Sequence, residues 1–153
     1  MKIFLDGEEV LISRKDIKKV NNLKWRQHKV KTFTYFVSHN KGVRTWLHRF
    51  ILGCPKGKFV DHRSGDTLDN RRSNLRICTH TENNRNRKIS KNNFSGYKGI
   101  SISNRKAGTW RARIMVDWKR MCLGSFKNKE EAAKAYNRAA LKYYGEFANL
   151  NKF

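Results

Sequence analysis

Two neighbouring residues in the middle of the chain, Asp61 and His62, carry side chains suited to hydrolytic chemistry. Asn74 follows His62 by twelve residues, and Asn83 follows Asn74 by nine. Carboxylate and amide oxygens are hard ligands that suit Mg²⁺ or Mn²⁺. An imidazole beside such an ion can take a proton from water near neutral pH, and a second Asn can hold that imidazole in the correct tautomer. Together these are the parts of metal-assisted phosphodiester hydrolysis.

Spacing alone does not prove that these residues form a site. Taken alone, His62 is an ordinary surface or core histidine. Asp61 and His62 would face opposite sides of a regular strand, so they meet at one ion only if the strand ends or twists there. The other acidic and amide residues nearby are interpreted as turn, loop or helix-surface residues: Asp66, Asp69, Asn70, Asn84 and Asn86.

The charge of the chain points to a polyanionic partner. Of its 153 residues, 35 are Lys or Arg and 12 are Asp or Glu, which gives a formal net charge of +23. No acidic residue occurs between Glu82 and Asp117, whereas that stretch holds nine basic residues, Arg85 and Arg87 among them. Such a stretch could be a solvated face, but a track for nucleic-acid phosphates explains the collected charge better.

Several classes of protein are excluded at this stage. No apolar run approaches the length of a membrane span, and the N-terminus meets acidic residues too early for a signal peptide. The cysteines, Cys54, Cys78 and Cys122, are widely spaced and form no CxxC pair, which argues against a zinc knuckle. We expect reduced, mostly buried cysteines in the cytoplasm of a bacterial or phage-infected cell, and no membrane partner.

The first half of the chain predicts short strands around the candidate site. Strands are expected at 2–5 and 10–12 around the turn Asp6-Gly7, and again at 31–37 and 44–52, with a short helix within 16–25. Residues 59–62 and 75–78 predict two more strands on either side of a polar loop. A helix follows, capped by Thr79 or Thr81 and running through Asn83 to about Lys88.

The second half has a different pattern. The composition of residues 88–96 predicts a polar linker. Strands are expected at 97–103, 110–116 and 119–126, with turns at Ala107-Gly108 and Asp117-Trp118. Residues 129–144 predict a helix, because Glu130 and Glu131 occupy its first turn and small or aromatic residues recur at helical spacing.

The residues around the candidate site resemble a known family. Leu47-His48-Arg49 and the run VDHRSGDTLDNRRSNLRICTHTENNRNR are similar to the HNH homing endonucleases of phages and bacterial introns. The resemblance implies a strand–loop–strand–helix unit called the ββα-metal finger, at about 47–88. It implies that His62 is the general base, that Asn74 orients His62, and that Asp61 and Asn83 are the two protein ligands of one divalent ion, Mg²⁺ or Mn²⁺. His48 is placed on the strand before the finger, where it either approaches the phosphate or is buried.

The C-terminal part resembles a second family. YKGI, TWRARI, LGSF and EEAAKAYNRAALKYYGEFANLN are similar to the APETALA-type DNA-binding domain of plant ethylene-response factors. That resemblance implies a three-stranded sheet in the major groove with a helix behind it. Ser101, Ser103 and Cys122 depart from the plant pattern, so plant target sites do not transfer. Trp110 is expected either to contact DNA or to pack in the core of this part. The DNA contacts expected in the chain are Arg85, Arg87, Lys98, Trp110, Arg111, Arg113 and Arg120.

The sequence therefore predicts an α+β protein. A small N-terminal antiparallel sheet with the HNH finger (1–88) is joined by a linker (89–96) to a three-stranded antiparallel sheet packed on one helix (97–151). The expected function is a homing-type DNA endonuclease that acts as a monomer on double-stranded DNA and nicks one strand. A non-catalytic DNA-binding regulator and a basic RNA-binding or ribosomal protein also explain the charge, but neither needs the complete set of Asp61, His62, Asn74 and Asn83.

Overall fold

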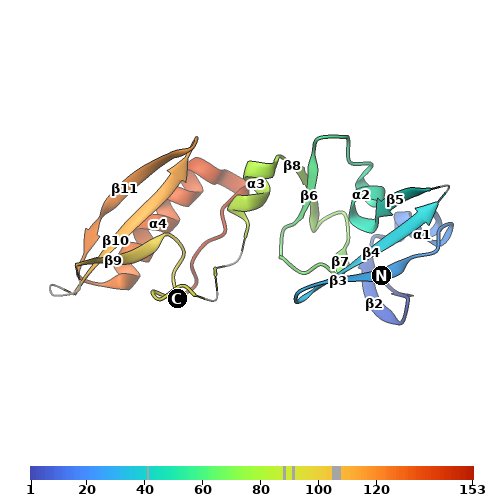
Figure 1. The fold of residues 1–153 in the computed structure, drawn as a ribbon, viewed down its shortest axis with the longest axis horizontal. Coiled ribbons are helices and arrows are strands. Elements are labelled where there is room, and N and C mark those ends of the chain that lie inside the picture. The colour runs from blue at the N-terminus through green and yellow to red at the C-terminus, as the bar shows by residue number, and fades with distance from the viewer. Residues whose placement is uncertain (41, 88, 91, 105–107) are drawn as a thin grey trace. The chain divides into compact units, whose positions relative to one another are not determined.

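The computed structural model describes residues 1–40, 42–87, 89–90, 92–104 and 108–153. The chain divides into two compact units, a first unit from Met1 to Asn84 and a second unit from Arg85 to Phe153 (Figure 1). The division falls before the expected linker, so the described residues between 85 and 96 belong to the second unit. Lys88 and Lys91 of that linker lie outside the described residues.

The first unit consists of short strands and short helices. In chain order these are β1 (Lys2–Leu5), β2 (Glu8–Ile12), the 3-10 turn η1 (Arg14–Asp16), α1 (Ile17–Asn21), β3 (Arg26–Val30), β4 (Phe33–Asn40), β5 (Val43–Trp46), α2 (Leu47–Leu52), β6 (Phe59–His62), β7 (Asp69–Asn70), β8 (Leu75–Cys78) and α3 (His80–Arg85).

The described strands before the finger belong to two small sheets rather than the single N-terminal sheet expected, and the two finger strands form a third sheet. β1 and β2 form the expected hairpin, whose turn residues Asp6 and Gly7 both have positive φ. β7 adds to β2 in parallel, and this pairing ties the polar loop after His62 to the N-terminal hairpin. β3, β4 and β5 form an antiparallel sheet, and β6 pairs antiparallel with β8.

The expected strand over 44–52 is wrong in its second half. β5 ends at Trp46, and Leu47–Leu52 forms α2, which ends at Gly53 in the left-handed conformation. Leu47 and Ile51 lie four residues apart on one helix face, and both are fully buried. The aromatic and branched residues therefore pack as a helical stripe, so His48 lies on a helix and not on a strand.

One hydrophobic core holds the first unit together. Its buried members come from β2, α1, the residue before β3, β4, α2, β6 and β8, so the strands of the predicted finger are anchored on the N-terminal elements. Burying each such side chain typically stabilises a fold by about 1.5–3 kcal/mol. The buried residues are Val10, Ile12, Val20, Trp25, Phe36, Leu47, Ile51, Val60 and Leu75.

The second unit is a three-stranded antiparallel sheet covered by one long helix, as the sequence predicts. Asn128 caps the helix by accepting hydrogen bonds from the amides of Glu130 and Glu131. Among the described residues, no helix is long and apolar enough to cross a membrane. The elements are β9 (Ile100–Asn104), β10 (Thr109–Val116), β11 (Lys119–Phe126), α4 (Lys129–Tyr144) and the 3-10 turn η2 (Gly145–Phe147).

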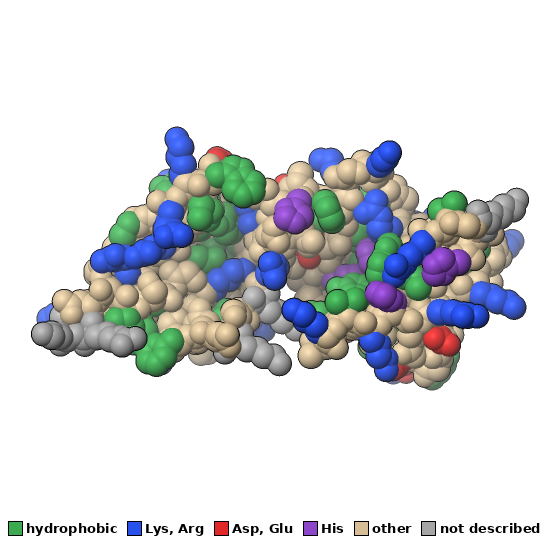
Figure 2. Space-filling model, in the orientation of Figure 1, with side chains coloured by type: hydrophobic (Ala, Val, Ile, Leu, Met, Phe, Trp, Pro, Cys, Tyr) green, Lys and Arg blue, Asp and Glu red, His purple; other side chains and the backbone are tan. Residues whose placement is uncertain are grey.

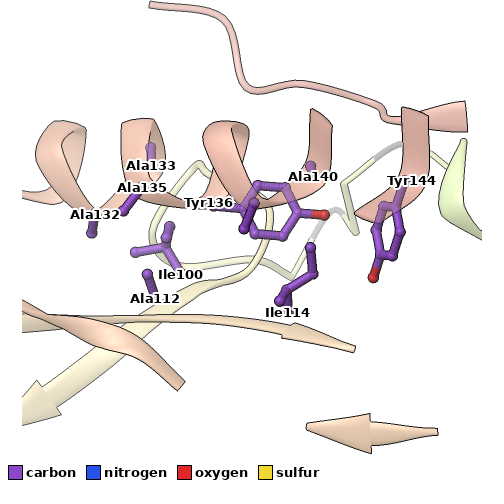
Figure 3. Packing of buried hydrophobic residues seen from close by; sticks show 10 residues of the cluster. Ile100, Ala112, Ile114, Ala132, Ala133, Ala135, Tyr136, Ala140 and Tyr144 are labelled. Carbon is purple, nitrogen blue, oxygen red and sulfur yellow. The ribbon is translucent and has the colours of Figure 1, made fainter. Parts of the chain in front are cut away.

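The small residues of α4 let it lie close to the sheet. Ile100, Ala112 and Ile114 project from the sheet toward the helix, where Tyr136 and Ala140 meet them (Figure 3). The expected turn at Asp117-Trp118 is present, whereas Ala107 of the other turn lies outside the described residues.

Gly99 has a φ of +77°, and a Cβ there would lie 2.2 Å from the Tyr136 ring, so only glycine fits. All three cysteines of the chain are free: Cys78 is buried and Cys54 half-buried, but Cys122 is exposed, contrary to expectation.

Candidate active site and nucleic-acid interface

His62 ends strand β6 and is buried, with 6% of its surface exposed. Its Nε2 lies 3.4 Å from Oδ1 of Asn70, and Nδ2 of Asn70 donates to the main-chain oxygen of Thr67 at 3.0 Å. Because that amide nitrogen is already committed to Thr67, Asn70 presents its oxygen to the ring. This arrangement favours the tautomer with hydrogen on Nε2, which leaves Nδ1 as the basic nitrogen.

The His62 ring is thus contacted by Asn70, which the sequence predicts to be an ordinary loop residue. Asn74, the residue expected to orient His62, instead closes the loop between β6 and β7. Its Oδ1 accepts from the amide of Ser64 at 2.9 Å, and its Nδ2 donates to the main-chain oxygen of Asp69 at 2.7 Å. Asn74 thus fixes the segment that follows His62, and its influence on the ring passes through the backbone.

A group of aromatic rings lies on another side of His62. The His48 ring packs against His62 with centroids 5.3 Å apart and planes at 68°. Tyr35 lies 5.8 Å from His48 and 6.4 Å from His62, and Trp46 lies 6.1 Å from His48. We call Tyr35, Trp46 and His48 the ring wall. The first-unit core holds this wall in place, since Leu47 beside His48 and Phe36 beside Tyr35 are both buried.

Burial sets the charge state of the two imidazoles. It lowers the pKa of His48 from 6.5 to about 3, with His62 and Arg49 adding to the effect. Burial also lowers the pKa of His62, although the hydrogen bond with Asn70 and the charge of Asp61 oppose that shift. Both rings are consequently neutral at neutral pH, which is the state a proton-accepting base requires.

Asp61 is buried and forms an ion pair with Arg76, which lies directly opposite on β8. Nε and a terminal nitrogen of Arg76 donate to Oδ2 of Asp61 at 2.8 and 2.6 Å. The β6–β8 ladder stays regular to the pair His62–Leu75, so Asp61 and His62 leave the strand on opposite faces. The structure therefore does not show the twist that would bring them together at one ion.

Asn83 lies on α3, whose start forms a capping box. The amide of Thr79 donates to Glu82 at 2.7 Å, and the amide of Glu82 donates back to the Thr79 hydroxyl at 3.2 Å. Thr79 is thus the cap expected from the sequence, although the helix ends at Arg85, short of Lys88. Asn83 is half-buried, and within the described part of the chain its side chain has no hydrogen-bond partner. The same part of the chain holds no cluster of three or more His, Cys, Asp or Glu that could bind a metal ion.

The second unit has a basic face on the side of the sheet away from α4. Ala112 and Ile114 are buried against the helix, so Arg111 and Arg113, which alternate with them on β10, point outward. Arg111 donates to the hydroxyl of Ser103 at 2.8 Å, and Arg120 is exposed on β11. Figure 2 shows Lys and Arg side chains over both units, with few acidic side chains on the face drawn.

Three of the expected DNA contacts have other roles in the structure. Trp110 packs with the core under α4, on the face opposite Arg111, and stacks on Phe94. Lys98 donates to the main-chain oxygens of Arg85 and Arg87 at 2.5 and 2.8 Å, and burial lowers its pKa to about 8.

Arg85 itself lies with its guanidinium 4.6 Å from the ring centroid of Tyr144. We therefore remove Trp110 and Lys98 from the candidate interface and treat Arg85 as a packed residue. Arg87 is exposed and stays a candidate.

Comparison with known proteins supports the assignment of the first unit. Residues 46–85 match the family model described as HNH endonuclease. An uncharacterized HNH endonuclease of Acanthamoeba polyphaga mimivirus is 36% identical over 124 residues, which cover 77% of this chain and 63% of that protein. Protein 3.8 of Escherichia phage T7 is 35% identical over 96 residues, which cover 63% of this chain and 78% of the phage protein.

A different group of relatives matches a smaller part of the chain. The rice APETALA2-like protein 2 is 39% identical over 57 residues, or 37% of this chain and 13% of the plant protein. No solved structure gives a significant match. The family model covers the strands and helix that carry Asp61, His62, Asn74 and Asn83, and the phage relative is matched over most of its length. The chain therefore belongs to the HNH endonucleases.

Proposed function

We propose that this protein hydrolyses a phosphodiester bond of double-stranded DNA, with His62 as the general base. The observation that carries the proposal is the setting of His62, a buried neutral imidazole at a strand end, held by Asn70 and packed against His48. A base of this kind typically contributes about 10²–10⁴-fold to a rate. Water attacks the phosphorus as His62 takes its proton, and the bond from phosphorus to the leaving oxygen breaks.

Asp61 and Asn83 are donors of the kind that a hard divalent cation such as Mg²⁺ or Mn²⁺ takes, although the structure pairs Asp61 with Arg76 on the face of β6 opposite His62. Asp61 offers a carboxylate and Asn83 an amide oxygen with no partner among the described residues, and both are ligand types that these ions prefer. We propose that these two residues hold the ion. When bound, it would stabilise the negative charge that develops on the phosphate. Arg76 neutralises Asp61 in the structure and limits how far its carboxylate can turn.

The remaining residues bind and orient the DNA. Arg111, Arg113 and Arg120 offer guanidinium groups on the outward face of the second-unit sheet, and an Arg fork matches the edge of guanine in the major groove. The partial match to APETALA2-like proteins supports this assignment of the sheet. We propose a homing-type enzyme that works as a monomer, and since the chain carries one copy of the catalytic set, each protein would nick one strand.

The test is nicking of supercoiled DNA that carries the target site. Wild-type protein should convert it to the open circle with Mg²⁺ or Mn²⁺, and excess chelator should stop the reaction. Asn83→Ala should require more metal for half-maximal nicking, whereas its exposed helix neighbour Asn84→Ala serves as the matched control and should not. Nicking that continues unchanged in chelator would refute the proposed cation, and equal metal requirements for the two variants would refute the role of Asn83.

A further inference from the structure

A small pocket opens on the first unit beside the ring wall. It has a volume of about 320 Å³ and is formed where α1, β5 and α2 meet. Its charged and aromatic lining residues are Lys19, Arg44, Trp46, Arg49 and Phe50. None of the residues described as lining this pocket is acidic, so three cationic side chains surround it without a protein counter-ion. Cations gathered in this way repel one another, and a bound anion would relieve that repulsion.

The cations are held in place by the fold. Lys19 lies 4.4 Å above the ring centroid of Phe50 and donates to the main-chain oxygen of Phe50 at 2.7 Å. Arg44 stacks 4.6 Å above Trp46. Arg49 donates to the main-chain oxygens of Lys58 and Pro55 at 2.6 and 3.2 Å. An ammonium has three donors and a guanidinium five, so each side chain keeps N–H groups for an incoming anion.

The same contacts indicate which part of a nucleic acid fits. Lys19 and Arg44 cover the faces of the two aromatic rings, so those faces are not open for stacking with a base. What the pocket offers is positive charge and N–H donors, which match the oxygens of a phosphate.

The pocket is connected to the catalytic base through one shared residue. Trp46 lines the pocket and also belongs to the ring wall, where it lies 6.1 Å from His48, which in turn lies 5.3 Å from His62. The pocket and His62 are therefore only two ring contacts apart within one unit.

We propose that this pocket is an anchoring subsite for one backbone phosphate of the DNA near the phosphodiester that is cut. This inference rests on the proposed function, since it assumes that duplex DNA lies at His62. Its role is to fix the register of the strand, so that the bond to be cut lies against the base.

The experiment compares two adjacent lysines of α1. Lys19 lines the pocket, whereas Lys18 is exposed on the same helix and does not line it, so Lys18→Ala removes the same charge as a matched control. Affinity for target duplex is measured at several salt concentrations for Lys19→Ala, Lys18→Ala and Arg44→Gln. Removing one bound phosphate should flatten the slope of log K against log salt by about 0.9 for Lys19→Ala and Arg44→Gln, but not for Lys18→Ala. Unchanged thermal midpoints establish that the variants are folded.

A second arm locates the phosphate. Single phosphates around the nick are replaced in turn by neutral methylphosphonates. One replacement should weaken binding by wild-type protein and have no further effect on Lys19→Ala or Arg44→Gln. Equal behaviour of Lys18→Ala and Lys19→Ala would overturn the subsite, and so would the absence of any such position.

Lys19→Ala could also lose affinity for inorganic phosphate while its binding to duplex stays unchanged. That result would assign the pocket to a free anion and would overturn the proposal. Failure of the wild-type protein to bind target duplex at all would instead refute the proposed function. The two failures are therefore distinguishable.

Discussion

The imidazole of His48 stands edge-on against that of His62, with ring centroids 5.3 Å apart. Asn70 holds one ring nitrogen of His62, and His48 packs against the ring, so the orientation of the base is restricted by two elements, β7 and α2. His48 is held neutral by burial and does not add a charge beside the base. We therefore expect His48 to act on the reaction through its shape.

Two substitutions of His48 distinguish a packing role of its ring from a role of its nitrogens in proton transfer. The variant His48→Phe keeps a flat ring against His62, so we expect nicking within a few-fold of wild type. His48→Ala removes the ring and should lower kcat by about 10–100-fold with little change in DNA affinity, because small misplacement of a catalytic group is costly. Single-turnover rates and binding constants measure both. If His48→Phe is as slow as His48→Ala, then His48 acts through its nitrogens and the packing role is wrong.

The buried imidazoles also predict that acid destabilises the first unit. Unfolding returns the pKa of His48 from about 3 to about 6.5, and it raises the lowered pKa of His62 in the same direction. Between these values the unfolded chain binds more protons, so the free energy of unfolding should rise with pH from about 3 to 6.5 and then level off.

The indole signal of Trp25, buried in the first unit, can follow this unfolding by NMR during heating at about pH 4, 5.5 and 7, which span that window. In His48→Phe the dependence on pH should be weaker, because one buried imidazole is gone. An identical dependence in both proteins would contradict the assignment to His48.

The amide side chains of the loop have separable roles. Asn70→Ala removes the hydrogen bond to His62 and should lower kcat while DNA binding stays near wild type. Asn74→Ala removes the hydrogen bonds from the Asn74 side chain to the amide of Ser64 and the main-chain oxygen of Asp69. It should also lower the thermal midpoint of the first unit, since a buried unpaired polar group costs about 1–3 kcal/mol. Calorimetry and single-turnover nicking distinguish the two. Full activity in Asn70→Ala would show that this hydrogen bond does not orient the base.

Much of the fold follows from local patterns in the sequence. The Asp6-Gly7 hairpin, the strands on either side of the finger loop and the α4 helix are confirmed, because turn chemistry and periodicity act over a few residues. The strand expected over 44–52 ends at Trp46 and continues as a helix, since a short apolar run does not distinguish a strand from a buried helix. The short β7 strand is not predictable in this way, because its two residues pair with distant β2, a relationship that leaves no local signal.

The candidate site shows the same limit. The resemblance to the HNH family marks Asp61, His62, Asn74 and Asn83 as a set, and the family match covers all four. The sequence assigns Asn74 as the partner of His62, because spacing cannot distinguish a side-chain contact from closure of a loop. Only the register of β10 against its neighbours places Trp110 under α4. Lys98 resembles a phosphate contact, because the sequence does not reveal that carbonyl oxygens will surround it.

The second-unit sheet predicts different effects for neighbouring residues of β10. Arg111→Ala and Arg113→Ala remove outward guanidinium groups and should relax base preference at a few positions, by about 1–3 kcal/mol for each bidentate pair removed. Trp110→Phe alters the core side and should lower stability without changing base preference. Binding to a library of substituted target sites, with thermal midpoints as a control, measures both. Altered base preference in Trp110→Phe alone would place the DNA on the opposite face.

The most direct test of the account is the nicking rate of His62→Ala on its target duplex, measured in a single turnover with saturating metal and beside a binding assay. We expect the rate to fall by about 10²–10⁴-fold, because the base is lost, while the affinity for duplex stays near wild type, because Lys and Arg provide the binding. A folded His62→Ala protein that still nicks at more than half the wild-type rate would contradict the assignment of His62 as the general base.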